Sequence, residues 1–210
     1  MEYNDKSSFM NPPDWMLNVD SFRMYDPLAE FLGALENGLV EIRYIDCVVL
    51  AGHSCPTVAG AYIATFNALK ALYKEENPVR GEIKVELSNA KAEGVTGVIG
   101  NVASFICGVA DEGGFAGIGG KFSRRGKLEF GKDFEGDIKF TRVDNQKSVT
   151  LKIDTSIVPG DSRMMPLMQK ALQGLATDKE KEDFKELWQN RVKKMLTNKA
   201  LWDKIAPILN

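Results

Sequence analysis

Residues 57–73 constrain the fold most strongly, because they form a long apolar, alanine-rich stretch, TVAGAYIATFNALKALY. Its large apolar residues recur at helical spacing: Ile63, Phe66, Leu69 and Leu72. A helix that is apolar around most of its circumference is stable in water only when other elements cover it. We therefore predict a largely buried helix here, with the rest of the chain supplying the layers around it.

Several segments around this helix have the composition of β-strands. Residues 39–51, LVEIRYIDCVVLA, are rich in β-branched side chains, which predicts a central strand buried on at least one face. Residues 81–87, GEIKVEL, alternate apolar and polar positions and predict a second strand. Further hairpin-forming strands are predicted over 121–130, 137–143 and 148–153, with turns at Arg125-Gly126 and Asp144-Asn145.

Further helices are predicted from capping signals and apolar spacing. Asp26 followed by Pro27 predicts the start of a short helix that Gly38 ends. The segment 95–109 contains glycines, yet its apolar residues form one continuous helical stripe. Thr177 with Glu180 predicts a capping box for a longer helix near the end of the sequence, after a shorter one beginning near Pro166. These elements predict an α+β fold, with a mixed or antiparallel sheet packed by helices and a C-terminal helical appendage.

The elements divide the chain into three predicted parts. Residues 1–25 contain a Pro12-Pro13 pair, which predicts an extended arm whose Phe9, Trp15, Leu17 and Phe22 need a surface to cover them. That surface belongs either to the same chain or to a second copy. Residues 26–155 form the α+β domain, and residues 156–210 form the helical extension.

Composition and charge exclude several classes of function. The chain has 27 Lys and Arg against 29 Asp and Glu, so its net charge of −2 offers no basic surplus for a nucleic acid backbone. Its apolar runs are shorter than the roughly 20 residues that cross a bilayer, so no membrane partner is expected. Three cysteines are too few for a disulfide framework in a chain of 210 residues, and we expect a cytoplasmic protein with reduced thiols.

The segment Gly52-His53-Ser54-Cys55-Pro56 carries the chain's single histidine two residues from a cysteine. Imidazole and thiolate are the ligands that zinc and other borderline-soft divalent transition metals prefer, and residues i and i+2 of an extended segment project to one side. We therefore predict His53 and Cys55 as metal ligands, against the alternative that both are structural residues. Further ligands would come from Cys107, Asp46, Glu93 or Asp111, from water or a small molecule, or from a second copy of the chain.

Two other classes of function remain open at this stage. The apolar cleft expected between helix 57–73 and the sheet could hold haem or another tetrapyrrole, with His53, Cys55 or a methionine as axial ligand. The apolar arm and the helical extension could instead make the chain an accessory component or assembly factor of a larger redox complex.

The run Leu50–Gly60, LAGHSCPTVAG, followed by a small-residue helix, the strand GEIKVEL and a glycine-rich turn, resembles the FmdE-like family, which takes its name from formylmethanofuran dehydrogenase. The resemblance covers residues 26–155. It implies an α+β fold, a homodimer and a bound metal, usually zinc, for which the ligands in this sequence would be His53 and Cys55. The family implies no agreed reaction, so both a Lewis-acid enzyme and a metal carrier are expected possibilities. The stretch 88–93 here lacks the cysteine that many relatives carry, and the Cys-rich tail of some relatives is missing as well.

Overall fold

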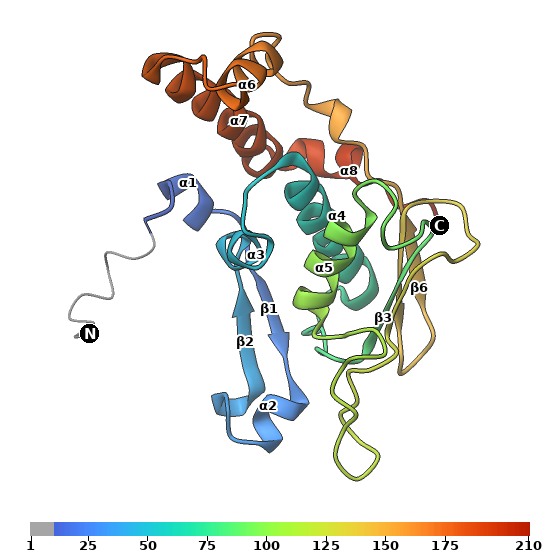
Figure 1. Cartoon of the computed structure of the whole chain (residues 1–210). Helices are drawn as coiled ribbons and strands as arrows, with labels where there is room; N and C mark the ends of the chain where they lie inside the picture. The colour runs from blue at the N-terminus through green and yellow to red at the C-terminus, as the bar shows by residue number, and fades with distance from the viewer. Residues whose placement is uncertain (1–10) are drawn as a thin grey trace, which may run out of the picture.

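Helices α4 (Pro56–Tyr73) and α5 (Thr96–Cys107) pack against each other and against a four-stranded sheet in the computed structural model (Figure 1), which describes residues 11–210. The strands are β4 (Leu128–Glu129), β3 (Ile83–Leu87), β5 (Ile138–Arg142) and β6 (Ser148–Leu151), in that spatial order. β3 runs parallel to β4 and antiparallel to β5. The mixed sheet and its helical layer confirm the predicted α+β class.

The alternating pattern of residues 81–87 is confirmed as a strand with one buried face. Ile83, Val85 and Leu87 of β3 are buried, and Lys84 and Glu86 between them are partly exposed. The β5–β6 hairpin is confirmed too. The hairpin expected at Arg125-Gly126 is wrong, because β4 pairs in parallel with β3 rather than antiparallel with the segment before it.

The predicted central strand over residues 39–51 is also wrong. Only β2 (Leu39–Ile42) is extended, and it pairs outside the main sheet with β1 (Phe22–Tyr25). The rest forms helix α3 (Tyr44–Ala51), at whose start the Asp46 carboxylate accepts the backbone N–H of Arg43 at 2.7 Å. A short buried helix and a buried strand both present continuous apolar runs, so composition does not separate them.

The N-terminal segment packs on the chain's own core. Helix α1 (Asp14–Leu17) precedes β1, and Phe22 makes aromatic contacts with Tyr62 and Phe66 of α4, at ring-centroid distances of 4.8 and 5.5 Å. The segment expected as an extended arm therefore contains a helical turn and a paired strand. Phe9, also predicted to need cover, lies outside the described residues.

Between β1 and β2 the chain forms helix α2 (Pro27–Phe31) and the short helix η1 (Glu36–Gly38). Asp26 caps α2, as predicted, by accepting the backbone N–H groups of Leu28 and Ala29. The predicted single helix over residues 27–37 is thus interrupted after Phe31.

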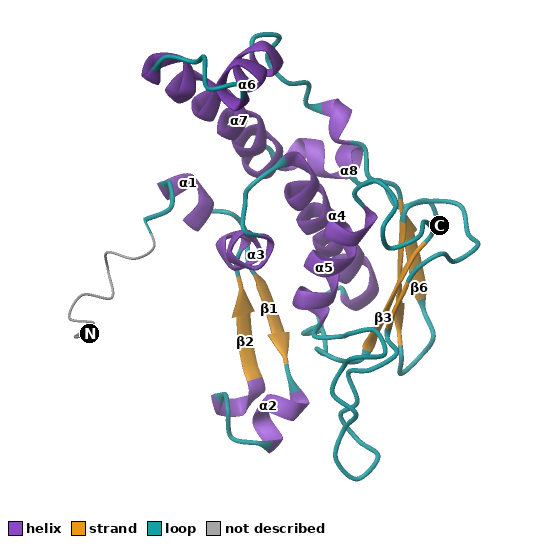
Figure 2. Ribbon diagram, viewed as in Figure 1, coloured by secondary structure: helices purple, strands orange, loops and turns teal. Residues whose placement is uncertain are grey.

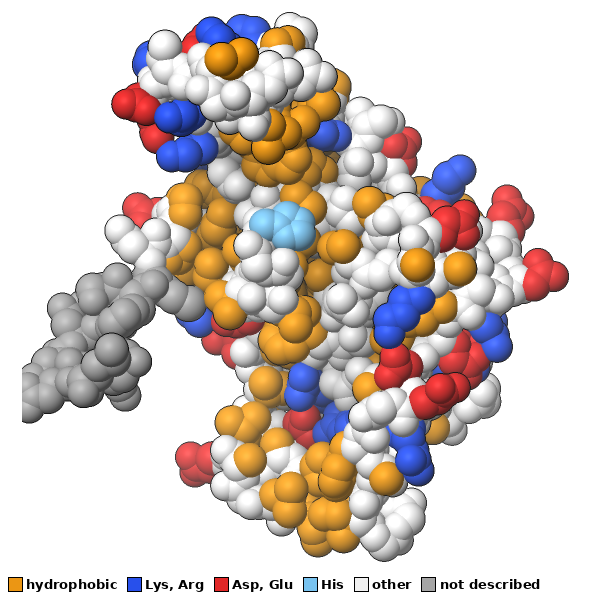
Figure 3. All heavy atoms as spheres, viewed as in Figure 1, with side chains coloured by type: hydrophobic (Ala, Val, Ile, Leu, Met, Phe, Trp, Pro, Cys, Tyr) orange, Lys and Arg blue, Asp and Glu red, His pale blue; other side chains and the backbone are white. Residues whose placement is uncertain are grey.

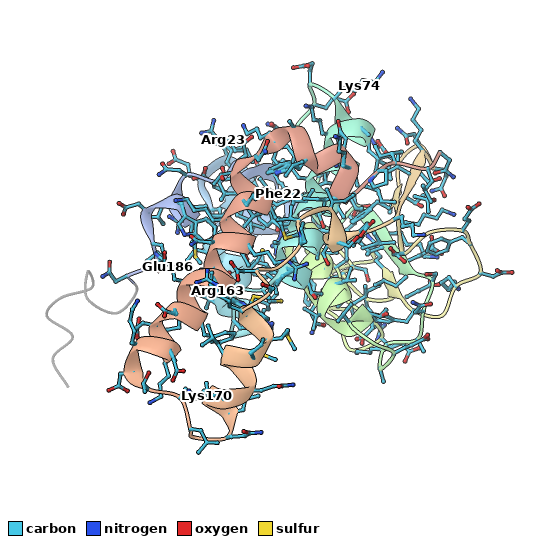
Figure 4. All side chains as sticks on the ribbon, turned by 90° about the horizontal axis from the view of Figure 1, so that it is seen from above. Phe22, Arg23, Lys74, Arg163, Lys170 and Glu186 are labelled. Atoms are coloured by element: carbon cyan, nitrogen blue, oxygen red, sulfur yellow. The ribbon has the colours of Figure 1, made fainter. Side chains whose placement is uncertain are left out.

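The C-terminal segment is helical, and the predicted capping box of Thr177 and Glu180 is confirmed at its longest helix. The elements are η2 (Thr155–Ile157), α6 (Met164–Leu172), α7 (Asp178–Thr197), η3 (Lys199–Leu201) and α8 (Trp202–Ile205). Figure 2 shows α6 and α7 as a helical pair projecting beyond α4, and Figure 4 places Lys170 of α6 at the far end of that pair. Val192, Met195 and Leu196 near the other end of α7 are buried in the core.

The last residues of the described chain return to the sheet. Ile208 forms an antiparallel bridge with Leu151 of β6, and the backbone N–H of Leu209 donates to the carbonyl of Thr150 at 2.8 Å. The side chain of Asn210 accepts the backbone N–H of Thr150 at 2.9 Å. Among residues 11–210, no helix is long and apolar enough to cross a membrane.

Candidate metal centre

His53 lies in the turn between α3 and α4, where the chain reverses direction. Gly52 ends α3 with a positive φ of 73°, a conformation that favours glycine, and leaves His53 exposed at the surface. Figure 3 shows the imidazole, in pale blue, on an open face of the molecule. Its Nδ1 lies 2.9 Å from the carbonyl oxygen of Ala51. A carbonyl only accepts, so Nδ1 carries the proton and Nε2 keeps its lone pair for another partner.

Cys55 is the N-cap of α4. Its Sγ accepts the backbone N–H of Val58 at 3.4 Å, and its side chain is largely buried. Pro56 occupies the first helical position, where a missing N–H costs nothing. The partial positive charge of the helix N-terminus stabilises negative charge on this sulfur. The thiol and the imidazole of His53 thus belong to one turn, as the sequence predicted.

The backbone between them is held by side chains from α3 and α7. The Ser54 carbonyl accepts hydrogen bonds from the Trp188 indole N–H at 2.8 Å and from the Gln189 amide at 3.3 Å. The Ser54 hydroxyl lies 2.9 Å from the hydroxyl of Tyr44, which is fully buried. Burial raises the pKa of Tyr44, so this phenol stays neutral.

The Oε1 atom of Gln189 is buried and, within residues 11–210, accepts no hydrogen bond. An unpaired buried acceptor costs about 1–3 kcal/mol, and such atoms in native proteins commonly mark an ion, a water or a ligand. The sequence did not predict a role for Tyr44, Trp188 and Gln189 at this site, because nothing in the local sequence shows that α7 crosses the His53 turn.

The other residues proposed as ligands are engaged elsewhere. Cys107 is fully buried, which raises the pKa of its thiol to about 12. Asp46 caps α3, Glu93 is exposed and accepts the backbone N–H of Ala90, and Asp111 pairs with Lys91 at 2.9 Å. Over the described part of the chain, no group of three or more His, Cys, Asp or Glu side chains gathers at one point.

The apolar space expected for a tetrapyrrole beside α4 is occupied by the protein itself. At Gly60, near the start of the helix, a Cβ atom would lie 2.9 Å from Cγ2 of Ile153 and 3.2 Å from Cγ2 of Thr155. Val58, Ala61 and Ile63 are fully buried. The helix is therefore in direct contact with the chain that follows β6, which does not favour a flat ligand between them.

The donor set at the turn fits a borderline-soft metal ion only in part. An exposed imidazole whose Nδ1–H is fixed by a backbone carbonyl is the usual arrangement of a histidine ligand, and a thiol at a helix N-terminus is a suitable second donor. Two donors fill half of a tetrahedral shell. The remaining positions would need water, a small molecule or a second chain.

These features define an α+β protein that presents an imidazole and a thiol at one helix junction. The family model described as "FmdE, Molybdenum formylmethanofuran dehydrogenase operon" matches residues 50–201. The chain belongs to this FmdE family. The match includes the His53–Cys55 segment and continues through α7 to η3, well past the boundary at residue 155 drawn from the resemblance. No curated protein and no solved structure matches the chain.

Proposed function

We propose that this FmdE-family chain binds a divalent transition metal ion, zinc by preference, through Nε2 of His53 and Sγ of Cys55. The observation that carries the proposal is the Nδ1–Ala51 hydrogen bond, which fixes the tautomer and directs the free lone pair away from the backbone. The helix N-terminus at Cys55 adds a site that stabilises a thiolate.

The protein supplies few ligands, and this limits what the site can do. A zinc ion with open positions supplies Lewis-acid chemistry or passes to another protein, whereas a closed four-ligand shell is structural. The bonds from Tyr44, Trp188 and Gln189 hold the ligand-bearing turn in place. The free Oε1 of Gln189 is an acceptor for a proton donor bound next to Ser54.

Metal analysis of untagged protein, purified without added metal, tests the proposal. We expect about one equivalent of zinc in the parent protein and loss of metal in His53→Ala and in Cys55→Ser. Cys107→Ala is the matched control, since it removes a thiol that is buried away from the turn, and it should keep the metal. Equal metal content in His53→Ala and the parent would contradict the proposal.

A homodimer is the second part of the proposal. Large apolar side chains are exposed on α2, β2 and α3, and burying them against a second copy would remove them from water. They are Phe31 at 61% exposure, Leu39 at 57% and Val49 at 60%. Sedimentation velocity should show a dimer that Leu39→Glu dissociates, whereas a monomeric parent would contradict the proposed homodimer.

The cytoplasmic location stays a prediction. If no metal is found, the alternative function is that of an accessory component of a larger redox complex.

A further inference from the structure

A cleft of about 600 Å³ opens between α2, the C-terminal half of α5 and the glycine-rich loop of residues 111–122. Its floor holds three charged side chains that are distant in the sequence: Asp26, Arg80 and Arg124. Their side chains are 5%, 23% and 11% exposed, respectively. The cleft uses neither His53 nor Cys55, and the proposed metal site leaves it unexplained.

Asp26 binds both arginines and also caps α2. Its Oδ1 accepts Nη2 of Arg124 at 2.5 Å together with the two capping N–H groups of α2, and its Oδ2 accepts Nη1 of Arg80 at 3.1 Å. The carboxylate therefore accepts four hydrogen bonds, three on Oδ1 and one on Oδ2. These bonds and the charge of Arg124 outweigh the effect of burial, and they lower the pKa of Asp26.

The two arginines, by contrast, have N–H donors that bind no protein acceptor among the described residues. Arg80 also donates to the carbonyls of Phe105 and Ile106, and Arg124 to that of Gly108, at the end of α5. A guanidinium has five N–H donors. Within residues 11–210, Arg80 uses three of them and Arg124 two, so about half of the donors at the cleft floor have no protein acceptor.

The side chains at the floor carry a surplus of positive charge. Two guanidiniums face one carboxylate, and the carbonyl end of α5 reduces the resulting single positive charge to about half. A monoanion comes closer to neutralising this surplus than a dianion such as phosphate does. A carboxylate also matches the two-pronged geometry of a guanidinium.

The walls above the charged floor are mainly apolar. They come from α2, α3, α5 and the glycine-rich loop: Leu28, Leu32, Leu50, Phe105, Val109 and Phe115. The volume lies within the roughly 300–1,000 Å³ that small-molecule sites occupy. On the face that carries His53, Figure 3 shows apolar side chains around a group of basic and acidic ones.

We propose that this cleft binds a small amphipathic carboxylic acid, with its carboxylate on the free donors of Arg80 and Arg124 and its apolar body against the walls of the cleft. Asp26 is a positioning residue, because its two ion pairs orient both guanidiniums. The cleft is independent of the metal site proposed at His53 and Cys55.

Calorimetric titration with octanoate and with its neutral isostere octanamide tests the proposal. We expect octanoate to bind at least about tenfold more tightly than octanamide, since only the anion completes a charge-assisted pair. Inorganic phosphate alone should bind more weakly than octanoate. Equal affinity for octanoate and octanamide would overturn the proposal and leave the arginines as caps of α5.

Two kinds of variant locate the site. Asn101→Trp places a large ring at the exposed edge of the cleft without touching the ion pairs, and should weaken octanoate binding by about tenfold or more. Asn190→Trp, the same change on an exposed position of α7, should leave octanoate binding unaltered.

Arg124→Gln should abolish the preference for octanoate over octanamide. If that variant does not fold, the comparison of Asn101→Trp with Asn190→Trp still tests where octanoate binds. His53→Ala should bind octanoate as the parent does, and unchanged binding by Asn101→Trp would refute the location.

Discussion

The indole N–H of Trp188 and the carbonyl of Ser54 lie 134 residues apart in the sequence and 2.8 Å apart in space. This bond ties the C-terminal helix α7 to the turn that carries His53 and Cys55. Helix α7 of the C-terminal appendage therefore contacts the candidate site, and the family match extends over that helix.

Trp188→Phe should destabilise the protein by about 1 kcal/mol, because it deletes this hydrogen bond and keeps most of the aromatic ring. Chemical denaturation followed by circular dichroism measures the change in free energy of unfolding. Phe184→Leu, one helical turn earlier and without a bond to the turn, is the control for lost aromatic area. If the metal is bound as proposed, Trp188→Phe should also lower metal affinity, whereas Phe184→Leu should not.

Stability should fall at alkaline pH because of two buried thiols. Burial raises the pKa of Cys47 and that of Cys107 from an ordinary value near 9 to about 12. In the unfolded chain these thiols ionise near pH 9, so the stability they contribute is complete below pH 9 and is lost as the pH rises toward 12. The free energy of unfolding, measured between pH 8 and pH 10.5, should decline less steeply in the double variant Cys47→Ala, Cys107→Ala. Parallel curves for parent and variant would show that these two thiols do not cause the loss of stability at alkaline pH.

Asp26→Asn should be strongly destabilising, by about 3 kcal/mol, since it leaves two arginines without their buried counter-charge. The pKa of Asp26 is below its usual value, so its contribution is present above pH 4 and lost as the pH falls through the lower folded pKa. Acid denaturation of the variant should consequently depend less on pH than that of the parent. Asp133→Asn, at an exposed position, is the control and should behave like the parent.

Gly60→Ala should destabilise the core although it improves helix propensity. The gain is about 1 kcal/mol, but the added methyl meets two β-branched side chains with little freedom to move, and overpacking of this kind costs about 1–3 kcal/mol. In the background Ile153→Ala, which removes the nearest atom, the same substitution should become neutral or stabilising. A thermal melt of the four proteins of this double-mutant cycle measures the coupling.

The sequence predicted those helices and strands that are determined by residues close together in the chain. Asp26 before Pro27 and Thr177 before Glu180 fix helix starts through bonds within one turn, and β3 follows from alternation alone. Residues 39–51 were misassigned because an apolar run has the same composition in a short helix as in a strand. Asp46, whose carboxylate accepts the backbone N–H of Arg43, was the one local indication of a helix start, but arginine is not a usual N-cap residue.

The candidate metal centre divides in the same way. His53 and Cys55 are visible in the sequence because they are neighbours in a motif. Tyr44, Trp188 and Gln189 reach the turn from two other helices. Arg80 and Arg124 bind Asp26 although they lie 54 and 98 residues from it in the sequence. Such encounters depend on tertiary packing, which periodicity and spacing do not encode.

The return of residues 208–210 to the sheet has a consequence for how copies of this protein can associate. By bonding along β6, these residues occupy backbone groups that would otherwise template another strand. The opposite edge is β4, which is only two residues long. Neither margin of this sheet offers a long row of open amides and carbonyls, so association by extension of the four-stranded sheet is suppressed. The exposed apolar face of α2, β2 and α3 is then the place where a second copy would dock.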